Sequence, residues 1–382
     1  MIIALFLILF AQIAFHKTTF AAPADPTPIE YKQPDGTTIT ITLKGDEKIN
    51  WAETADGYTL ISNGKGGWEY AVKDANGDLK NSGILAHEVG KRTNHEISFI
   101  RQLTKKLSFS SEQVNMLKSV WEAKIGSDKL IGTGSFFRAN ASGGNKKNSL
   151  KSTEVFTPSG EKKLLMILIQ FPDLHFTKTQ AEFNGLMNTT GYNDNGAQGS
   201  VHDYFLEVSY GQFNLTTDVA PSIYTADHDM AYYGADETIG EYTNHSPNAP
   251  ELMAEAVQKA NADGVDFSQY DNDGDGEVDG IYVIFAGYSQ AAGGPADALW
   301  SHAGVVAGSP ILVDGVNVTK YSCSNELRGN SGTDMTTIGV VCHEFGHICG
   351  APDYYDTDYG SSGGEYQGTS YWDLMAYGIH NG

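Results

Sequence analysis

Two histidines and a glutamate lie near the C-terminal end of the chain at a spacing that can bind a metal ion. The sequence there reads His343-Glu344-Phe345-Gly346-His347. Residues four apart on a helix lie one turn above each other on the same face. His343 and His347 can therefore offer two imidazole nitrogens to one tetrahedral zinc ion, and Glu344 is placed to act as a general base on a water molecule at that ion.

The residues that follow His347 favour Asp353 as a third, oxygen ligand. Gly350 permits a left-handed turn that ends the helix, and Pro352 reinforces the stop, so that the chain can double back. Two histidines and a carboxylate leave one position open for water, which is typical of catalytic zinc sites. The pattern predicts metal-assisted hydrolysis, in which zinc acidifies water and polarises a carbonyl group while Glu344 moves the proton.

Other readings of the motif are open. One class of zinc proteases takes its third ligand from a glutamate on a second helix, and Glu365 is the only glutamate after His347. Residues 359–368 are rich in glycine and poor in helix formers, so Asp353 is preferred over Glu365. Asp356 is a weaker competitor because its spacing is wrong. A core helix with two hydrogen-bonded histidines is the structural alternative.

A second segment, YWDLMAY (371–377), follows the zinc motif. Together the two segments resemble the metzincin clan of zinc peptidases, in which a methionine-containing turn runs beneath the metal. An aspartate as third ligand, followed by WDLM, is similar to the immune-inhibitor-A family of secreted bacterial metalloproteases. The resemblance covers residues 161–382 and includes LLMILIQF, SVHDYFLEVSYGQF, DNDGDGEVDG, LWSH and CSNEL.

The resemblance implies a zinc-dependent endopeptidase that hydrolyses peptide bonds in proteins. The roles that it implies are zinc ligands for His343, His347 and Asp353, general base for Glu344, and methionine of the turn for Met375. Tyr377 stands where some metzincins carry a tyrosine close to the metal, although a packed turn tyrosine is the alternative. A catalytically decayed, calcium-stabilised extracellular binding or adhesive protein is the rival function; the intact ligands and base favour the enzyme.

An acidic loop, DNDGDGEVD (271–279), precedes a predicted buried strand. Its carboxylates at the first, third, fifth and ninth positions, with glycine at the sixth, follow the first part of an EF-hand loop, although Tyr282 replaces the glutamate expected at the twelfth. Carboxylates this close repel one another unless they share a cation. We therefore expect a structural calcium ion, with an unoccupied acidic turn as the alternative. The expected ligands are Asp271, Asp273, Asp275, Glu277 and Asp279.

The first residues are typical of a signal peptide. An apolar run (2–15) is followed by Ala22-Pro23-Ala24, an A-x-A-like cleavage site, and the run is short for a bilayer span. Because a basic start is missing, an uncleaved membrane anchor is the alternative. We expect a secreted, periplasmic or extracellular protein whose mature form has no stable membrane span.

Charge divides the chain into two parts. The net charge of −22 argues against nucleic acid as a partner. Residues 1–151 carry 19 Lys and Arg against 15 Asp and Glu, whereas residues 152–382 carry 6 against 32. A polar linker, with a trypsin-like cleavage point at Lys146-Lys147, lies at this boundary. The expected segments are a signal peptide (1–24), an N-terminal prodomain (25–140), a linker (141–152) and a C-terminally truncated catalytic domain (153–382).

Periodicity predicts the elements that position these residues. Strands at 37–43, 58–63 and 68–72, separated by Asp-Gly and Gly-Gly turns, form a small antiparallel sheet, and residues 111–124 form a helix. Residues 74–78 are read as a hairpin turn. In the catalytic part, 164–171 and 281–286 are buried strands, and 201–208 and 250–262 are helices. The predicted fold is an α/β (α+β) metzincin-like zinc protease domain with a mixed sheet and an active-site helix, preceded by a small, mainly β prodomain with a helix.

This order of segments predicts a zymogen, in which a slightly basic prodomain docks in cis on an acidic enzyme. A permanent N-terminal β domain is the alternative. The leading part has no cysteine, which excludes latency by a cysteine on the zinc. Two states are open for the cysteines: a disulfide between Cys323 and Cys342, or buried free thiols at Cys323, Cys342 and Cys349. Cys342 and Cys349 share a face of the predicted helix but cannot form a disulfide within it.

Overall fold

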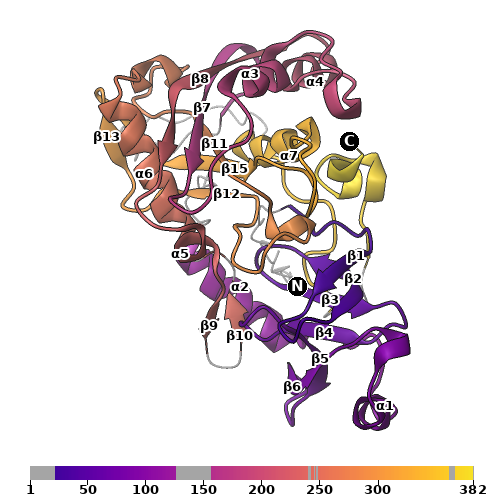
Figure 1. Cartoon of the computed structure of the whole chain (residues 1–382). Coiled ribbons are helices and arrows are strands. Elements are labelled where there is room, and N and C mark those ends of the chain that lie inside the picture. The colour runs from indigo at the N-terminus through magenta and orange to yellow at the C-terminus, as the bar shows by residue number, and fades with distance from the viewer. Residues whose placement is uncertain are drawn as a thin grey trace, which may run out of the picture.

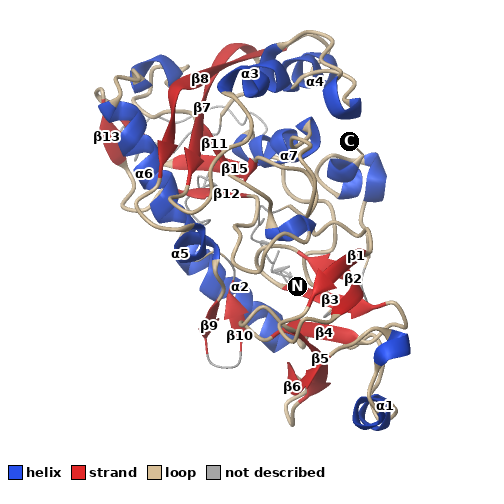
Figure 2. Cartoon of the chain, in the orientation of Figure 1, coloured by secondary structure: helices blue, strands red, loops and turns tan. Residues whose placement is uncertain are grey.

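Two separate sheets organise the chain (Figure 1). The computed structural model describes residues 22–125, 156–239, 242–244, 246, 248–360 and 366–381. The apolar run, the predicted linker with Lys146-Lys147, and Glu365 lie outside these residues. One sheet belongs to the N-terminal part (22–125) and the other to the C-terminal part (156–381), and Figure 2 shows the helices gathered mainly around the second.

The N-terminal sheet has six antiparallel strands that pair in sequence order. Along β2 every second residue is buried (Ile39, Ile41 and Leu43), so one face of the sheet packs on a core. Residues 74–78 form the tight turn between the last two strands, where the Asp74 amide donates to the Asp78 carbonyl at 2.9 Å. The strands are β1 (Ile29–Lys32), β2 (Thr38–Gly45), β3 (Asn50–Thr54), β4 (Thr59–Ser62), β5 (Trp68–Lys73) and β6 (Leu79–Leu85). The three predicted strands are confirmed as β2, β4 and β5.

Two helices follow this sheet, α1 (Asn94–Ile100) and α2 (Ser111–Ile125). Helix α1 begins with a capping box, in which Thr93 and Glu96 each bond the other's backbone amide. Helix α2 confirms the predicted helix at 111–124 and buries Val114 and Trp121.

The C-terminal sheet is mixed and has the order β12-β15-β11-β7-β8. Strands β15, β11, β7 and β8 run parallel to one another, and the edge strand β12 is antiparallel to its neighbour β15. The strands are β7 (Gly160–Gln170), β8 (Phe213–Thr225), β11 (Ile281–Phe285), β12 (His302–Val305) and β15 (Lys320–Asn325). Two strand pairs lie outside this sheet, β9 (Glu237–Ile239) with β10 (Tyr242–Asn244) and β13 (Ile311–Val313) with β14 (Val316–Val318).

Helices cover both faces of the mixed sheet. Side chains of β7 alternate between two cores: Leu165, Ile167 and Ile169 face α5 and α6, whereas Leu164, Met166 and Leu168 face α3, α4 and α7. A strand buried on both faces needs a continuous apolar run, which explains its sequence. The helices are α3 (Gln180–Asn188), α4 (Val201–Val208), α5 (Met230–Gly234), α6 (Ala249–Ala262) and α7 (Ile338–Ile348). The predicted strands at 164–171 and 281–286, helices at 201–208 and 250–262, and mixed α/β architecture are confirmed.

Short 3-10 helices complete the structure: η1 (Val89–Lys91), η3 (Asp194–Gly196), η4 (Phe267–Tyr270), η5 (Gln290–Ala292), η6 (Ser370–Trp372) and η7 (Tyr377–His380). Within the described ranges, the helices are too short or too polar to cross a membrane. All three cysteines are free thiols, so the disulfide between Cys323 and Cys342 is wrong and the alternative of free thiols is confirmed.

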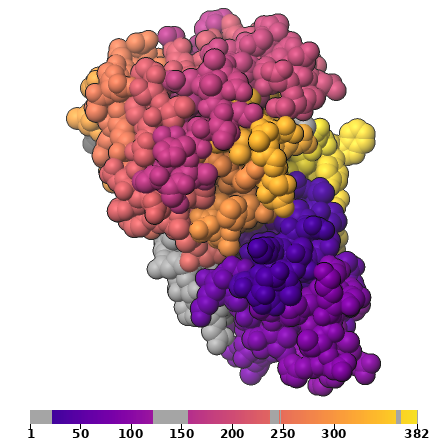
Figure 3. Space-filling view, viewed as in Figure 1, coloured from indigo at the N-terminus to yellow at the C-terminus, as the bar shows by residue number. Residues whose placement is uncertain are grey.

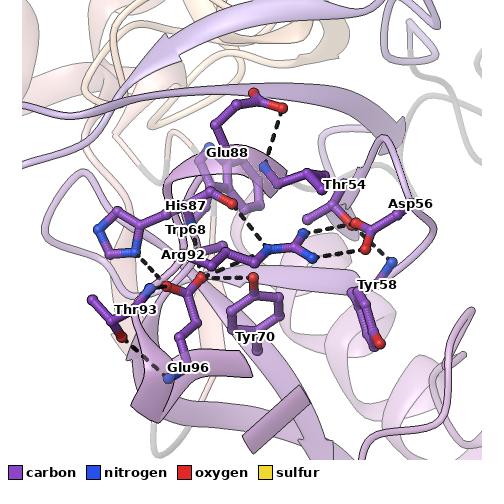
Figure 4. Close-up of polar contacts among 12 residues, drawn as sticks. Thr54, Asp56, Tyr58, Trp68, Tyr70, His87, Glu88, Arg92, Thr93 and Glu96 are labelled. Carbon is purple, nitrogen blue, oxygen red and sulfur yellow. Dashed lines mark hydrogen bonds and ion pairs between the residues drawn. The ribbon is translucent and has the colours of Figure 1, made fainter. Parts of the chain in front are cut away.

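A partly buried polar network ties α1 to the N-terminal sheet (Figure 4). Arg92 binds Asp56 through two nitrogens, each at 2.7 Å. Glu96 accepts hydrogen bonds from the Tyr70 hydroxyl at 2.8 Å and from the His87 amide at 3.0 Å. The His87 ring lies 2.9 Å from both the Glu96 and the Asp35 carboxylates. Charge-assisted bonds of this kind are stronger than neutral ones, so the network fixes the helix on the sheet.

The N-terminal part should lose stability as the pH rises through neutrality. Burial opposes protonation of His87, but its bonds to Asp35 and Glu96 outweigh burial and raise its pKa above the ordinary 6.5. A raised folded-state pKa gives stability that is complete below about pH 6.5 and is lost as the pH rises through the folded value. The denaturant midpoint of the N-terminal part should therefore fall between pH 6 and pH 8 in the wild type and change less in His87→Gln. Exposed His95→Gln is the control, and equal pH dependence in the wild type and His87→Gln would contradict the assignment.

Candidate metal centre and active site

The HExxH residues lie on α7, which packs against the mixed sheet. Val341, Phe345 and Ile348 point into the core on that side of the sheet, and His343, Glu344 and His347 are buried as well. The helix ends where Gly350 takes the left-handed conformation (φ 90°) and its amide donates to the His347 carbonyl at 2.9 Å. The chain then reverses, as predicted, and brings Asp353 back to the helix.

Three ligand atoms converge at the end of this turn. The Nε2 atoms of His343 and His347 are 3.2 Å apart, and Asp353 Oδ1 lies 3.5 Å and 3.4 Å from them. Zinc bonds of about 2.0–2.1 Å in a tetrahedron separate neighbouring ligand atoms by about 3.3–3.4 Å. The three atoms therefore form one triangular face of a tetrahedron of the size that a zinc ion requires.

Backbone carbonyls hold both imidazole rings in place. The Nδ1 atom of His343 lies 2.8 Å from the Leu374 carbonyl, and that of His347 lies 2.9 Å from the Ala351 carbonyl. These contacts require a proton on Nδ1 and turn the Nε2 lone pairs toward Asp353. Burial and the neighbouring His343 keep the pKa of His347 well below its usual value, which favours the neutral form that binds metals.

Met375 packs directly beneath the part of α7 that carries the two histidines. A Cβ atom on Gly346 would lie only 2.9 Å from the Met375 sulfur, so glycine at this position allows the close approach. The Met375 carbonyl accepts from the Tyr354 amide at 2.7 Å, which joins the methionine turn to the segment that carries Asp353. Tyr377 lies among aromatic rings, with centroids 6.0 Å from Tyr371 and 6.3 Å from Tyr355.

Glu344 is fully buried beside this triangle. Neither of its carboxylate oxygens has a hydrogen-bond partner among the described residues. Burial, followed by the charges of Glu47 and Asp353, raises its pKa well above the usual range. A buried carboxylate with two unused oxygens is costly unless a cation and a water molecule lie next to it, so the donor set fits a metal centre.

A loop from the N-terminal part (46–49) also enters this centre, which the sequence did not indicate. It joins β2 to β3 and carries Asp46, Glu47 and Lys48, all at most 2% exposed. Asp46 accepts from the hydroxyls of Tyr355 at 3.1 Å and Tyr359 at 2.7 Å. Figure 3 shows the N-terminal residues lying directly against the orange and yellow C-terminal segments. The letters GDEKIN read as an exposed polar turn, so the sequence carried no signal for this burial.

Lys48 is the only cation among the charged groups of this loop. Its Nζ atom lies 3.2 Å from Glu47 Oε1 and 3.7 Å from Asp46 Oδ2. It also lies 5.1 Å from the ring centroid of Trp121 on α2, and that ring packs edge-on against His302 at 6.3 Å. Loop 46–49 is therefore enclosed by both parts of the chain.

The acidic loop gathers three of its five predicted calcium ligands. Ligand atoms of Asp271, Asp273 and Asp275 all lie within 4.8 Å of one another. Glu277 and Asp279 instead bond protein groups: Glu277 accepts from Asn317 and Thr319, and Asp279 accepts from Asn272. The side chain of Tyr282 is buried and bonds Ser324 at 2.9 Å, away from the solvent.

Comparison with known proteins gives the family of the chain. It is similar to Immune inhibitor A of Bacillus thuringiensis subsp. alesti, with 28% identity over 257 residues that cover 58% of this chain and 36% of that protein. It is also similar to the pre-pro-metalloprotease PrtV of Vibrio cholerae serotype O1 (strain M66-2), with 29% identity over 258 residues that cover 56% of this chain and 27% of that protein. The chain thus matches about a third of the length of these relatives.

Residues 153–382, which contain His343, Glu344, His347 and Asp353, match the family described as immune inhibitor A peptidase M6, catalytic domain. The predicted family is confirmed, and the chain belongs to the immune inhibitor A (M6) family of peptidases.

Proposed function

We propose that the chain is an exported, zinc-dependent endopeptidase that hydrolyses peptide bonds in proteins and is made as a zymogen. The observation that carries the proposal is the triangle of His343 Nε2, His347 Nε2 and Asp353 Oδ1, with mutual distances of 3.2–3.5 Å, beside the buried carboxylate of Glu344. The relatives, one of which is named a metalloprotease, agree with this chemistry.

His343, His347 and Asp353 would hold the zinc ion and leave one position open. When bound, zinc makes water more acidic and polarises the scissile carbonyl. Glu344 accepts a proton from water through one of its unused oxygens and returns it to the leaving amine. The carbonyls of Leu374 and Ala351 keep both imidazoles oriented during the reaction. A decayed binding protein would have no need for this intact base and its oriented ligands.

Loop 46–49 is the element that we propose keeps the enzyme latent. It brings the buried carboxylate of Glu47 close enough to raise the pKa of Glu344, after burial itself. A substrate carbonyl has to reach the same groups, so loop and substrate exclude each other. Lys48 offsets the negative charges that the loop adds, because its ammonium group attracts Asp46, Glu47 and Asp353.

Release of this loop would require the N-terminal part to leave. Asp46 is anchored by Tyr359, whose ring packs edge-on against Trp51 at 6.3 Å, and α2 closes over Lys48 through Trp121. Helix α2 comes just before the predicted linker, so cleavage at Lys146-Lys147 would separate the inhibitory part (25–140) from the catalytic part (153–382).

Calcium is proposed as a structural ion in the acidic loop, held by Asp271, Asp273 and Asp275. The Asp271 carboxylate accepts hydrogen bonds of 2.8–3.1 Å from the backbone amides of Gly274, Asp275 and Gly276. The loop is therefore already curved around the three carboxylates. Glu277 and Asp279 would support the loop from outside through their bonds to Thr319 and Asn272. Oxygen ligands in such a loop suit calcium.

Glu344→Ala should separate metal binding from catalysis. With the linker cut by trypsin and the trypsin then inhibited, the wild type should cleave casein, and the variant should lose about 100- to 10,000-fold of this activity because the proton carrier is gone. Zinc content, measured by mass spectrometry, should stay at one ion per chain in both. Exposed Glu207→Ala is the matched control. Normal casein cleavage by Glu344→Ala would refute the assignment, and a folded wild type without zinc or activity would favour the binding-protein alternative.

Glu47→Ala should activate the uncut chain. Removal of the carboxylate leaves the site open to substrate, so we expect at least about a tenfold higher rate of peptide cleavage than for the uncut wild type. Glu47→Gln, which keeps the size of the side chain, distinguishes loss of charge from loss of folding. The control is Glu30→Ala on the exposed side of β1. If neither Glu47 variant gains activity while both become fully active after linker cleavage, the loop is not the inhibitor.

Calcium should stabilise the wild type and not Asp273→Asn. Calcium at 100 times its dissociation constant adds about 2.7 kcal/mol, which corresponds to a rise in melting temperature of about 5–10 °C for a domain of this size. Thermal unfolding with calcium and with EGTA measures the difference. Exposed Asp229→Asn should respond like the wild type; an equal rise in Asp273→Asn would exclude the acidic loop as the binding site.

A further inference from the structure

A cavity of about 70 Å³ lies where the first described residues meet α7. On one side it is lined by Ala22, Pro23 and Asp25 of the N-terminal part. On the other side it is lined by the start of α7, by Arg328, and by the residues after the methionine turn, including His380.

The cavity is close to the reacting groups. Val340, which lines it, precedes Glu344 by four residues and so lies on the same face of α7, one turn or about 5.4 Å away. On the other side, the Ala24 amide donates to the Gly45 carbonyl at 2.8 Å, and Gly45 directly precedes loop 46–49. The cavity is therefore adjacent to the space where the scissile bond of a substrate would lie.

Its walls favour a negatively charged group. The N-cap residue of α7, Thr337, lines the cavity and makes no side-chain cap, and the first amides of a helix carry partial positive charge. Arg328 is the single arginine in residues 152–382, a region with 6 basic and 32 acidic residues, and it faces this cavity. The buried Nε2 atom of His380 has no hydrogen-bond partner among the described residues.

The N-terminal part already places a carboxylate here. Ala22 and Ala24 are 2% exposed, the Trp300 indole donates to the Ala22 carbonyl at 2.9 Å, and the Asp25 amide donates to the Ala291 carbonyl at 2.9 Å. Asp25 thus lies at the cavity wall. Its charge and that of Arg328 both act on the His380 ring, with burial as the larger influence that lowers the pKa of His380.

We propose that this cavity is a substrate subsite for an acidic side chain, aspartate or glutamate, next to the scissile bond, and that Arg328 is its specificity-determining residue. Residues 22–25 cover the subsite in this structure; residues 22–24 leave with the expected signal peptide (1–24), and Asp25 leaves with the prodomain. This inference rests on the proposed peptidase function, since it assigns a side-chain preference to the same site.

The test uses the full chain with its linker cut and matched peptides that carry glutamate or glutamine at one position on either side of the cleavage point. Arg328→Gln and the control Lys178→Gln remove one positive charge each; Lys178 does not line the cavity and forms a 3.9 Å ion pair with Glu182. We expect the wild type and the control to prefer glutamate by about 5- to 10-fold in kcat/KM at one position, and Arg328→Gln to cleave the glutamate and glutamine peptides with a kcat/KM ratio of about one.

Binding of the same labelled peptides to the Glu344→Ala protein, followed by fluorescence anisotropy, gives a readout that needs no hydrolysis. A glutamate preference in binding that disappears with Arg328→Gln, without hydrolysis by the wild-type chain, would support the subsite and refute the peptidase. Hydrolysis with the same glutamate-to-glutamine ratio in wild type and Arg328→Gln would overturn the subsite alone. Equal binding, or no binding, of both peptides would also overturn it.

Discussion

The left-handed turn at Gly350 is the constraint on which the candidate site depends. Gly350 follows the end of α7 at Ile348 and sends the chain back, so that Asp353 Oδ1 comes within 3.5 Å of both histidine nitrogens. A residue with a Cβ would be strained in this conformation, and a longer helix would carry Asp353 away from the two histidines. The Ala351 carbonyl, which orients His347, is placed by the same turn.

The methionine turn supports this geometry from below. Met375 fills the space that Gly346 leaves on the helix, and the preceding Leu374 carbonyl orients His343. The two histidines are thus held by two segments that come later in the chain, one after the helix end and one at the methionine turn. A short helix face, two carbonyls and one packed sulfur atom define the positions of all three ligand atoms.

Local patterns in the sequence predicted much of this arrangement, because the forces involved are local. The i, i+4 spacing of His343 and His347 and the stop at Gly350 depend on neighbouring residues only, and the continuous apolar run of β7 reflects burial on both sheet faces. Burial of Glu47 could not be predicted, because its surroundings are residues about 300 positions later. The bonds of Glu277 could not be predicted for a similar reason: its hydrogen-bond partners Asn317 and Thr319 come from a distant strand pair and its flank.

The contact between Asp46 and Tyr359 has a consequence for how the protein is made, because 313 residues separate its two partners. Domains form from the N-terminus first during synthesis, and contacts this distant in sequence form last. The six-stranded sheet can fold as soon as it emerges, since its strands pair in order along the chain. Loop 46–49 of this sheet is therefore formed before Tyr355 and Tyr359 are synthesised. The later residues around His343, His347 and Asp353 then assemble against a sheet that has already folded. A segment synthesised 313 residues after Asp46 completes the candidate site and closes it in the same step.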